Sequence, residues 1–374
     1  MRIGINTRFL LSNKMEGFGW YTFEIVRRIV KNHPEHEFIF FFDRPYDKKF
    51  IFGENVTPVV LSPEARHPFL FYIWFEFSIK KALEKYKVDL FFSPDGYLSL
   101  SSKRDQIAVI HDINFEHNSK DVKWLARKYY HHFFPRFAKK AKHIITVSEY
   151  SKNDISETYS INPSKITSIW NGASNLFKPL DDKSKSQLNF ANNKPYFLFV
   201  GALSPRKNLK RLIEAFEIFK TTHSESDYQL VIVGQELWKN SNSDITISES
   251  VKNEIHFTGH VTLEELVEIM GAASVFTFVP YFEGFGIPLV EAMKCGTPIL
   301  SGDKTSLPEV AGDAALYCDP LNVSDIAEKL SVLALDNELQ RELSKKGLER
   351  AQMFSWDKAA ESTWDVIESV LLKD

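Results

Sequence analysis

The stretch “VFTFVPYFEGFGIPLVEAM”, residues 275–293, decides the fold predicted for this chain. It begins with an apolar, β-rich run, continues through a glycine-rich turn, and ends in an apolar segment with a helical pattern. Glu283 falls in the turn and Glu291 in the helical part. A strand followed directly by a turn and a helix is the building unit of α/β domains with parallel sheets.

The same alternation runs through the front half of the chain and restarts after residues 175–195, which are rich in Pro, Asp, Ser and Asn and predict a linker. Helical patterns separate most of the strand-like runs. These runs are “RIGIN”, “EFIFFF”, “DLFFSPD”, “IAVIHDI”, “HIITVS” and “ITSIWNG” before the linker, and “YFLFVG”, “YQLVIVG”, “IHFTG”, “VFTFVP”, “PILSG” and “ALYCD” after it.

The fold predicted from this pattern is α/β, with two Rossmann-like, doubly wound domains facing a central cleft. A chain of 374 residues is also long enough for two hydrophobic cores. We expect a first domain at residues 1–178 and a second at residues 190–354. The final helix, within residues 355–374, is expected to pack back on the first domain.

Composition narrows the protein class. With 44% hydrophobic and 25% charged residues the sequence is typical of an ordinary globular protein. The start “MRIGINTRFL” lacks the apolar region of a signal peptide, and no apolar run reaches the roughly 20 residues that span a bilayer. Cys295 and Cys318 form neither a disulfide framework nor a zinc motif, which favours a reducing cytoplasm.

Charge is distributed unevenly. Residues 1–180 carry a formal charge of +8 and the remainder −11, from a total of −3. The two predicted domains are therefore expected to meet different partners.

The segment “VGALSPRKNLKRLIEAF”, residues 200–216, predicts a phosphate site. Ser204 suits a helix N-cap and Pro205 the first helical position. Arg206 and Lys207 would then lie at the positive end of the helix dipole, where cations are disfavoured unless an anion is bound nearby. The alternative is that both are solvated surface cations.

The two glutamates of the opening stretch predict a binding site along one helix. If the helix starts in the turn, eight residues bring Glu291 back to the side of Glu283, two turns further on. A sugar nucleotide could then give its hexose hydroxyls to Glu283 and its ribose to Glu291. Its phosphates would meet the amides of residues 285–287, which are Phe285, Gly286 and Ile287. Alternatively, Glu283 only complements the dipole and Glu291 is a structural acid.

Two further strand ends are candidates. “IAVIHDIN” places His111 at the end of a buried-type strand, pointing into the predicted cleft or, alternatively, into the core. Asp112 is expected to cap the turn that follows. “NKMEGFGWYTFEIV” places Gly17 and Gly19 after the first strand, where they allow a ligand to approach the backbone or merely start a helix.

In this order, these motifs resemble the retaining GT-B glycosyltransferases of family 4. The resemblance covers essentially the whole chain and rests on “EGFGIPLVE” with its E-x7-E spacing, “GALSPRKN”, the “HD” pair and the first glycine turn. “TVSEYSKNDI” and “TSLPEVAGDAALYCDP” agree with it. Phe18 departs from the pattern, since adjacent glycines and a small residue are common there, and would narrow the donor or acceptor pocket.

The resemblance implies a role for each matching residue. Arg206 and Lys207 would hold the donor diphosphate and stabilise the leaving group, Glu283 and His111 would bind the hexose, and Glu291 the ribose. Val261, in “HFTGHV”, would line the pocket of the base. No cofactor or metal is implied, and no two aspartates stand at the i and i+2 spacing of a DxD motif.

The implied reaction moves a hexose from a nucleoside diphosphate sugar, with GDP-mannose and UDP-glucose as the leading donors, to a saccharide or lipid-linked saccharide in cell-surface polysaccharide synthesis. Carboxylates two helical turns apart cannot form the pair about 5 Å apart that retaining hydrolases use. A same-face mechanism is therefore favoured, in which the leaving phosphate takes the acceptor proton. The alternatives are a sugar-nucleotide epimerase of the same fold and a non-catalytic sugar-nucleotide binding protein.

Two segments of the front half concern the acceptor side. Residues 122–143 carry seven Lys/Arg, no Asp/Glu and several aromatics, which suits a peripheral contact with the inner face of a membrane or, equally, a solvated cationic helix face. “PFLFYIWFEFSIKKAL”, residues 68–83, is expected to pack into the core. No nucleic-acid recognition motif is present.

Overall fold

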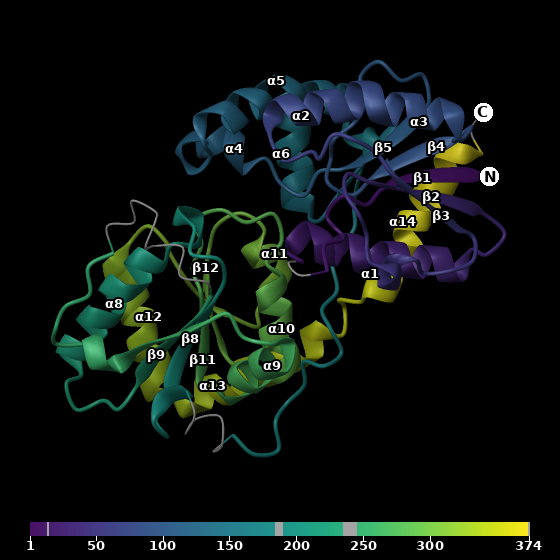
Figure 1. Ribbon diagram of the computed structural model, residues 1–374. Coiled ribbons are helices and arrows are strands. Elements are labelled where there is room, and N and C mark those ends of the chain that lie inside the picture. The colour runs from purple at the N-terminus through teal and green to yellow at the C-terminus, as the bar shows by residue number, and fades with distance from the viewer. Residues whose placement is uncertain (13–14, 184–189, 235–244, 373–374) are drawn as a thin grey trace. The chain divides into compact units, whose positions relative to one another are not determined.

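The computed structural model describes residues 1–12, 15–183, 190–234 and 245–372 (Figure 1). It divides into two compact units, one of Met1–Asn171 with Ser355–Asp374 and one of Gly172–Phe354. Each unit has its own parallel sheet with helices on both faces, so the predicted α/β class with two doubly wound halves is confirmed. In the described part of the chain, no helix is both long and apolar enough to cross a membrane.

The first unit contains a seven-stranded sheet in the order β3-β2-β1-β4-β5-β6-β7, with every neighbouring pair parallel. The edge strand β3 was not predicted, because Pro58 interrupts its pattern; proline is tolerated at a sheet edge, where one backbone donor needs no partner. The strands are β1 Arg2–Asn6, β2 Glu37–Phe42, β3 Val56–Val60, β4 Leu90–Ser93, β5 Asp105–Val109, β6 His143–Thr146 and β7 Ile166–Ser168.

Helices cover both faces of this sheet. Figure 1 shows α1 and α14 on one side, and α2, α3 and α5 on the other. Phe91 and Ala108 of the sheet, with Phe137 of α5, belong to the buried core on the second side. The helices are α1 Gly17–Asn32, η1 Lys48–Phe50, α2 Pro68–Ile73, the π-helix η2 Trp74–Ile79, α3 Lys80–Lys85, α4 Asn114–His117, η3 Ser119–Asp121, α5 Trp124–Lys140, α6 Glu149–Tyr159, η4 Pro163–Lys165 and α14 Trp356–Leu371.

The second unit contains a six-stranded parallel sheet in the order β10-β9-β8-β11-β12-β13. All six predicted runs form its strands, which are β8 Tyr196–Val200, β9 Gln229–Val233, β10 Ile255–Gly259, β11 Val275–Phe278, β12 Ile299–Gly302 and β13 Leu316–Cys318.

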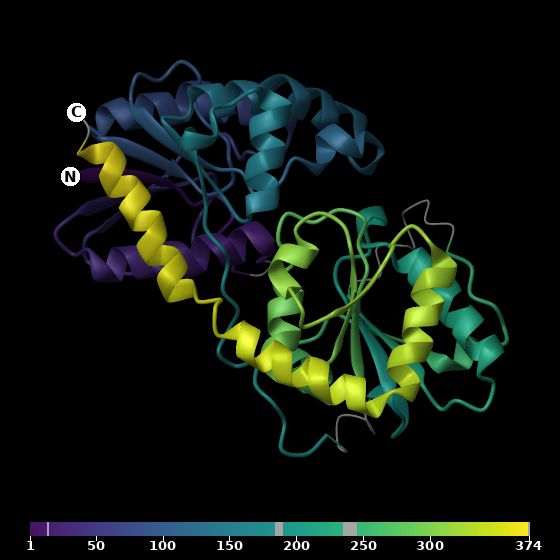
Figure 2. The same cartoon turned by 180° about the vertical axis from the view of Figure 1, so that it is seen from behind.

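The helices of the second unit flank this sheet: α8 and α12 pack on one face, and α9 and α10 lie on the other (Figures 1 and 2). Phe197 and Phe199 of β8 pack with Phe216 and Phe219 of α8 in a fully buried core. The helices are η5 Pro205–Lys207, α8 Leu209–Thr222, η6 Lys252–Glu254, α9 Leu263–Ala272, α10 Ile287–Cys295, α11 Leu307–Ala311, α12 Val323–Leu335 and α13 Asn337–Ala351.

The chain passes between the units earlier than the sequence predicts. Residues 172–178, which we expected in the first domain, belong to the second unit. Lys294 of α10 holds them there, because its Nζ donates to the carbonyls of Ala173, at 2.9 Å, and Ser174, at 3.2 Å. Within the predicted linker, residues 184–189 lie outside the described part of the chain.

The final helix α14 belongs to the first unit and packs against α1. The Trp364 ring stacks on His33 with 3.7 Å between centroids, and Trp356 meets the ring of Tyr21 at 6.1 Å. The first unit is therefore built from both ends of the chain.

Candidate functional site

The candidate site of the second unit lies where β8 and β11 end side by side. Lys207 and Arg206 follow β8 in the short η5 turn, and Glu283 lies in the turn after β11. The backbone joins these turns, since the N–H of Tyr281 donates to the carbonyl of Arg206 at 3.1 Å. Ligands of open α/β sheets bind beyond the carboxyl ends of strands, which is where these side chains meet.

One carboxylate is shared by two cations. Oε1 of Glu283 lies 2.7 Å from Nζ of Lys207 and 2.8 Å from Nη1 of Arg206. The Lys207 ammonium also lies 4.8 Å from the centre of the Phe278 ring. Two cations thus lie beside one carboxylate in a place where Glu283 is only 7% exposed. An arginine and a lysine held side by side with little water around them favour an anionic ligand.

The charged form of Glu283 is stabilised by this arrangement. Burial alone would raise the pKa of its carboxyl, but Lys207 and Arg206 outweigh the burial and lower the pKa below its ordinary value. The side chain is therefore ionised at neutral pH and can only accept hydrogen bonds.

The helix-dipole argument for the two cations is wrong. Ser204 precedes the turn as predicted, but Asn208 adopts a left-handed backbone, with φ of 63°, and α8 begins only at Leu209. Arg206 and Lys207 thus lie outside the first turn of α8. Their side chains are nevertheless held by Glu283, so the alternative of two solvated surface cations is also wrong.

Asn208 is a site residue that the sequence did not reveal. It is buried, and its Nδ2 donates to the carbonyl of Val279 at 2.9 Å and to that of Pro320 at 2.6 Å. This side chain ties the β8 turn to the segments after β11 and β13. The only signal in the sequence is its position directly after the two cations.

Thr305 and Ser306 hold the turn that carries Glu283. The backbone N–H of Glu283 donates to Oγ1 of Thr305 at 3.2 Å. The hydroxyl of Ser306 donates to the carbonyl of Glu283 at 2.9 Å and to that of Phe285 at 3.1 Å. Both residues belong to the segment “TSLPEVAGDAALYCDP”, which agreed with the family resemblance but to which we assigned no role.

The expected one-sided helix from Glu283 to Glu291 is wrong. α10 begins at Ile287, and Gly286 precedes it with φ of 100°, a left-handed conformation that glycine tolerates best. Glu283 lies outside the helix, while Phe285 packs its buried ring against Phe354. The geometry of two turns on one helix face therefore does not apply.

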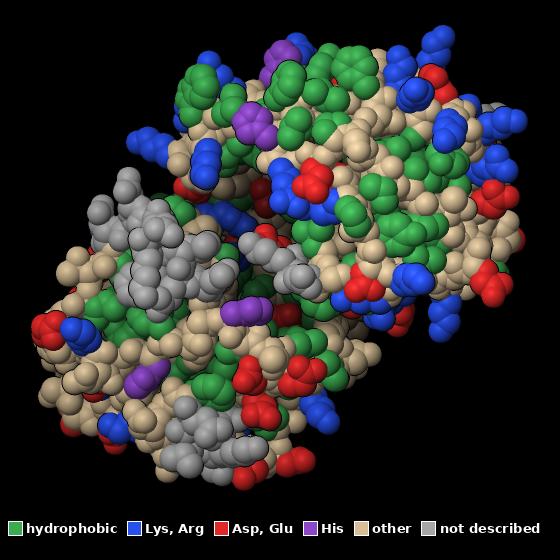
Figure 3. Space-filling model, in the orientation of Figure 1, with side chains coloured by type: hydrophobic (Ala, Val, Ile, Leu, Met, Phe, Trp, Pro, Cys, Tyr) green, Lys and Arg blue, Asp and Glu red, His purple; other side chains and the backbone are tan. Residues whose placement is uncertain are grey.

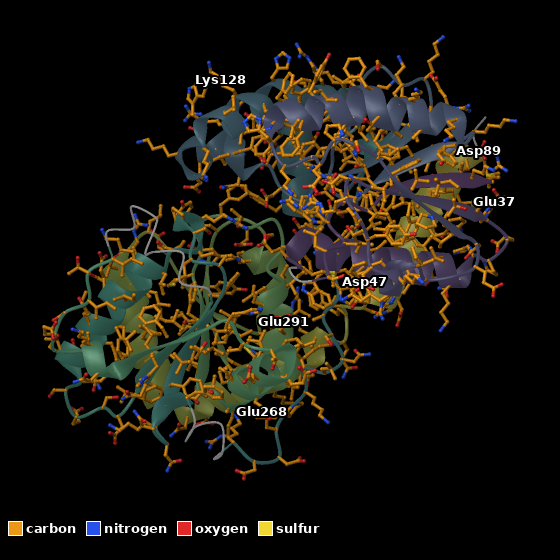
Figure 4. All side chains as sticks on the ribbon, viewed as in Figure 1. Glu37, Asp47, Asp89, Lys128, Glu268 and Glu291 are labelled. Atoms are coloured by element: carbon orange, nitrogen blue, oxygen red, sulfur yellow. The ribbon has the colours of Figure 1, made fainter. Side chains whose placement is uncertain are left out.

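Glu291 nevertheless lies close enough to the cluster for the charge of Lys207 to affect the pKa of its carboxyl. It comes from α10, on which Figure 4 labels it. Burial raises the pKa of its carboxyl to about 7, although Lys207 and Lys294 act in the opposite direction. Near neutral pH this side chain changes between hydrogen-bond donor and acceptor.

The first unit brings together a second set of predicted residues. His111 follows β5, and its Nε2 lies 2.9 Å from the carbonyl oxygen of Pro94. Its ring contacts Phe18, at 4.9 Å between centroids, and Tyr21, at 4.6 Å. Burial lowers the pKa of His111, so the ring is neutral at pH 7. Asp112 caps the turn as predicted, accepting from the N–H of Asn114 at 3.0 Å.

The glycine turn is the start of a helix. Gly17, Phe18 and Gly19 form the first turn of α1, which was the plainer of the two alternatives. A Cβ on Gly19 would lie 2.6 Å from the carbonyl of Phe9, whereas a Cβ on Gly17 would meet no atom of the described residues within 4 Å. The backbone at Gly17 is thus open to a ligand, and Phe18 is 44% exposed beside it.

The predicted residues thus form two sets, one in each unit. Val261 follows β10, which β9 separates from β8 in the sheet. Among the described residues, no three or more His, Cys, Asp and Glu side chains are grouped so that they could hold a metal ion.

Two family models match the chain. The model described as “Glycosyltransferase Family 4” matches residues 15–174, and “Glycosyl transferases group 1” matches residues 181–350. The two matches are consecutive, so one falls almost entirely on each unit.

Named relatives agree with these models. The O-antigen chain mannosyltransferase B of Escherichia coli is 27% identical over 93% of this chain and 95% of its own length. O-antigen chain mannosyltransferase RfbU of Salmonella typhimurium is 28% identical over 58% of this chain and 57% of its own length.

Solved structures show the same fold over the whole chain. The sucrose-phosphate synthase of Thermosynechococcus elongatus has a TM-score of 0.79 at 17% identity, covering 100% of both chains. WaaG, a glycosyltransferase involved in lipopolysaccharide biosynthesis, has a TM-score of 0.74 at 16% identity, covering 98% of this chain and 99% of its own. These likenesses show the GT-B fold, and the two family models, which match residues 15–174 and 181–350, show that the chain belongs to the group 1 glycosyltransferases.

Proposed function

We propose that this enzyme transfers a hexose from a nucleoside diphosphate sugar to a saccharide acceptor, with retention at the anomeric carbon. The observation that supports this most directly is the Arg206–Lys207 pair sharing Glu283 at the carboxyl edge of the second sheet. An arginine and a lysine held side by side among partly buried side chains suit a diphosphate, for which Arg offers a bidentate fork and Lys a point charge.

On the donor side, Lys207 and Arg206 bind the diphosphate and stabilise the charge that develops on it as the glycosidic bond breaks. Glu283, being ionised, accepts hydrogen bonds from hexose hydroxyls. Glu291 accepts from the ribose, and Val261 lines the pocket of the base.

Backbone groups complete the proposed donor site. The backbone amides just before and at the start of α10, those of Phe285, Gly286 and Ile287, would bind the phosphates. From the first unit, His111 contacts the hexose near the reacting carbon. The first turn of α1, at residues 17–19, offers the backbone of Gly17 and Gly19 and the ring of Phe18 to the donor.

The proposed chemistry keeps both bonds on one face of the sugar. Glu283 is held by two cations that lower its pKa, which makes it a poor nucleophile toward the anomeric carbon. The leaving phosphate instead takes the proton of the acceptor hydroxyl as that oxygen bonds to the carbon. Positioning and charge stabilisation then supply most of the rate.

Mannose is the hexose we propose first, because the relatives reported above are mannosyltransferases. GDP-mannose and UDP-glucose are the two donors to compare. O-antigen synthesis by those relatives also supports a role in making cell-surface polysaccharide.

The acceptor is proposed to be a saccharide or a lipid-linked saccharide that the first unit receives, while the second unit, including residues 190–354, binds the donor. The enzyme would then work in the cytoplasm at the inner face of a membrane, which it contacts through the basic, aromatic residues 122–143.

A donor screen tests this function. Wild-type enzyme should release hexose slowly to water from one GDP- or UDP-sugar, and transfer it faster once an acceptor is supplied. An epimerase would instead return an altered sugar, and a binding protein would show no turnover. Lys207→Ala and Glu283→Ala should each abolish transfer in a folded protein, while Lys210→Ala, an exposed lysine of α8, should not. Normal turnover in Lys207→Ala would refute the assignment.

A further inference from the structure

The helix at residues 68–79 exposes aromatic side chains that were expected in the core. Phe69 is 65% exposed and Phe77 60%, with Tyr72 between them at 41%. Trp74 and Phe75 of the same segment are buried, so the helix has its inner face in the core and a second aromatic face outside. The core-packing prediction therefore holds for the inner face of this segment and is wrong for Phe69, Tyr72 and Phe77.

The exposed aromatics continue onto α5. Tyr72 contacts Phe77, at 6.0 Å between ring centres, and Phe133 of α5, at 5.9 Å. Trp124 at the start of α5 is 59% exposed, and Nζ of Lys128 lies 4.1 Å from its ring centre. Figure 3 shows hydrophobic side chains interspersed with Lys, Arg and His over α2 and α5.

The charge carried by residues 122–143, which include α5, is positive. Residues 122–143 contain no acid. The acid of the neighbouring helix, Glu76, accepts from the backbone N–H groups of Leu100 and Ser101 and is thus used within the fold. Lys128 and Arg136 are exposed, and Figure 4 labels Lys128 on the outer side of α5.

We propose that this aromatic–basic surface binds an anionic lipid bilayer, with the aromatic rings in the interface and the cations on the headgroups. The inference rests on the proposed function, since a lipid-linked acceptor would be met at that surface. It assigns the apolar contact chiefly to α2 and η2, outside residues 122–143. The surface comprises Phe69, Tyr72, Phe77, Trp124, Leu125, Lys123, Lys128, Arg136 and Lys139.

The chemistry favours a bilayer over a protein or nucleic acid. Trp, Tyr and Phe on one helical face, with Lys and Arg beside them, are the features of helices that lie in the membrane interface. Each Lys or Arg near an anionic leaflet adds binding free energy that salt screens. The rings sit on helices packed into the core, so binding requires no folding step.

Not every cation of residues 122–143 belongs to this surface. Nζ of Lys140 donates to the carbonyl of Ser102 at 2.6 Å, and Lys142 lies 3.2 Å from Asp105. Neutralising them would disturb the fold as well as the charge. Lys128 and Arg136 are the better choices, since Nζ of Lys128 lies over the Trp124 ring and Arg136 contacts His132 one turn away.

The test is flotation of the full chain with vesicles of equal parts phosphatidylglycerol and phosphatidylcholine, beside vesicles of phosphatidylcholine alone. The wild type should float with the anionic vesicles, and less so at high salt. Lys128→Gln with Arg136→Gln should weaken binding by about 30-fold. Phe69→Ser with Phe77→Ser should weaken it by about 10-fold.

Matched controls come from elsewhere on the chain. Leu321→Ser with Leu335→Ser removes two apolar side chains of similar exposure from the second unit, and Lys31→Gln with Lys48→Gln removes two exposed cations of the first unit. Both controls should float like the wild type. Circular dichroism should be the same for all five proteins.

The proposal is overturned if the wild type stays unbound, binds both vesicle types equally, or is unaffected by the surface variants. It is also overturned if self-association or nucleic-acid binding, rather than flotation, is what these variants lose. Hexose release to water, measured without vesicles, should be the same in all five proteins. If the wild type floats but turns over no donor, the proposed function is contradicted, whereas the proposal that this surface binds a bilayer still holds.

Discussion

The Nζ of Lys207 lies 2.7 Å from Oε1 of Glu283, although the two residues belong to turns that follow different strands. Because Arg206 contacts the same oxygen, the Glu283 carboxylate holds two cations that would otherwise repel each other. The ion cluster is thus a structural feature as well as the proposed diphosphate site.

Removing that carboxylate should destabilise the second unit. Glu283→Ala leaves two neighbouring cations without their shared partner, and we expect a loss of roughly 2 kcal/mol in unfolding free energy, below the full cost of breaking a buried pair because Arg206 is partly exposed. Glu283→Gln should lose less, since its oxygen still accepts hydrogen bonds. Thermal denaturation measures both. Added pyrophosphate should recover part of the loss in Glu283→Ala, and equal melting of all three proteins would contradict this account.

Glu291 should make stability depend on pH. Its pKa is raised in the fold from 4.5 to about 7, so its contribution to stability is complete below its ordinary pKa and is lost as the pH rises through 7. The loss at alkaline pH is at most roughly 3 kcal/mol. Glu291→Gln should remove this loss. The unfolding free energy of the variant should therefore rise relative to that of the wild type between about pH 5 and pH 8. Melting temperatures measured over this pH range test the prediction, with Glu264→Gln, a change at an exposed glutamate, as the control. If the melting temperatures of Glu291→Gln and the wild type depend on pH in the same way, the raised pKa of Glu291 is excluded.

His111 should affect turnover and leave nucleotide binding unchanged. In the proposed site its ring meets the hexose, and its contacts with Phe18 and Tyr21 lie within the first unit. We expect His111→Ala to lower kcat by about 100-fold. Calorimetric titration with the nucleoside diphosphate alone should give the wild-type Kd. A parallel fall in affinity for that nucleotide would place His111 at the phosphates or the base.

Two variants of Asn208 should separate the contribution of its side-chain hydrogen bonds from that of its left-handed backbone. Asn208→Gly keeps a residue that adopts the left-handed backbone but leaves the carbonyls of Val279 and Pro320 without their donor. Asn208→Ala adds the strain of that backbone. The unfolding free energy of Asn208→Gly, measured by denaturant titration, should be roughly 2 kcal/mol lower than that of the wild type. The alanine variant should lose about 1 kcal/mol more. Wild-type stability of Asn208→Gly would show that the two hydrogen bonds contribute little.

Much of the fold follows from local sequence. Apolar runs such as residues 196–200 and 229–233 form buried parallel strands because both faces of each sheet are covered by helices. β3 escaped prediction because Pro58 is compatible only with an edge, and edge position depends on the strand order. Helix starts were misplaced at Asn208 and Gly286, whose left-handed conformations the neighbouring residues do not specify.

The site could be predicted in composition but not in geometry. The sequence indicated Arg206, Lys207 and Glu283 separately, whereas their contact depends on β11 lying next to β8 in the sheet. The exposure of Phe69 and Phe77 also depends on tertiary packing, because the opposite side of their helix already fills the core. Neither relationship is visible in a single stretch of sequence.

The central claim is that Lys207 and Arg206 bind a diphosphate. Calorimetric titration of GDP and UDP into wild type, Lys207→Ala and the matched control Lys210→Ala tests it most directly. We predict that one nucleotide binds the wild type and Lys210→Ala equally, and Lys207→Ala about 100-fold more weakly, as expected for loss of a charge-assisted hydrogen bond. Equal affinity of Lys207→Ala and wild type for that nucleotide would contradict the account.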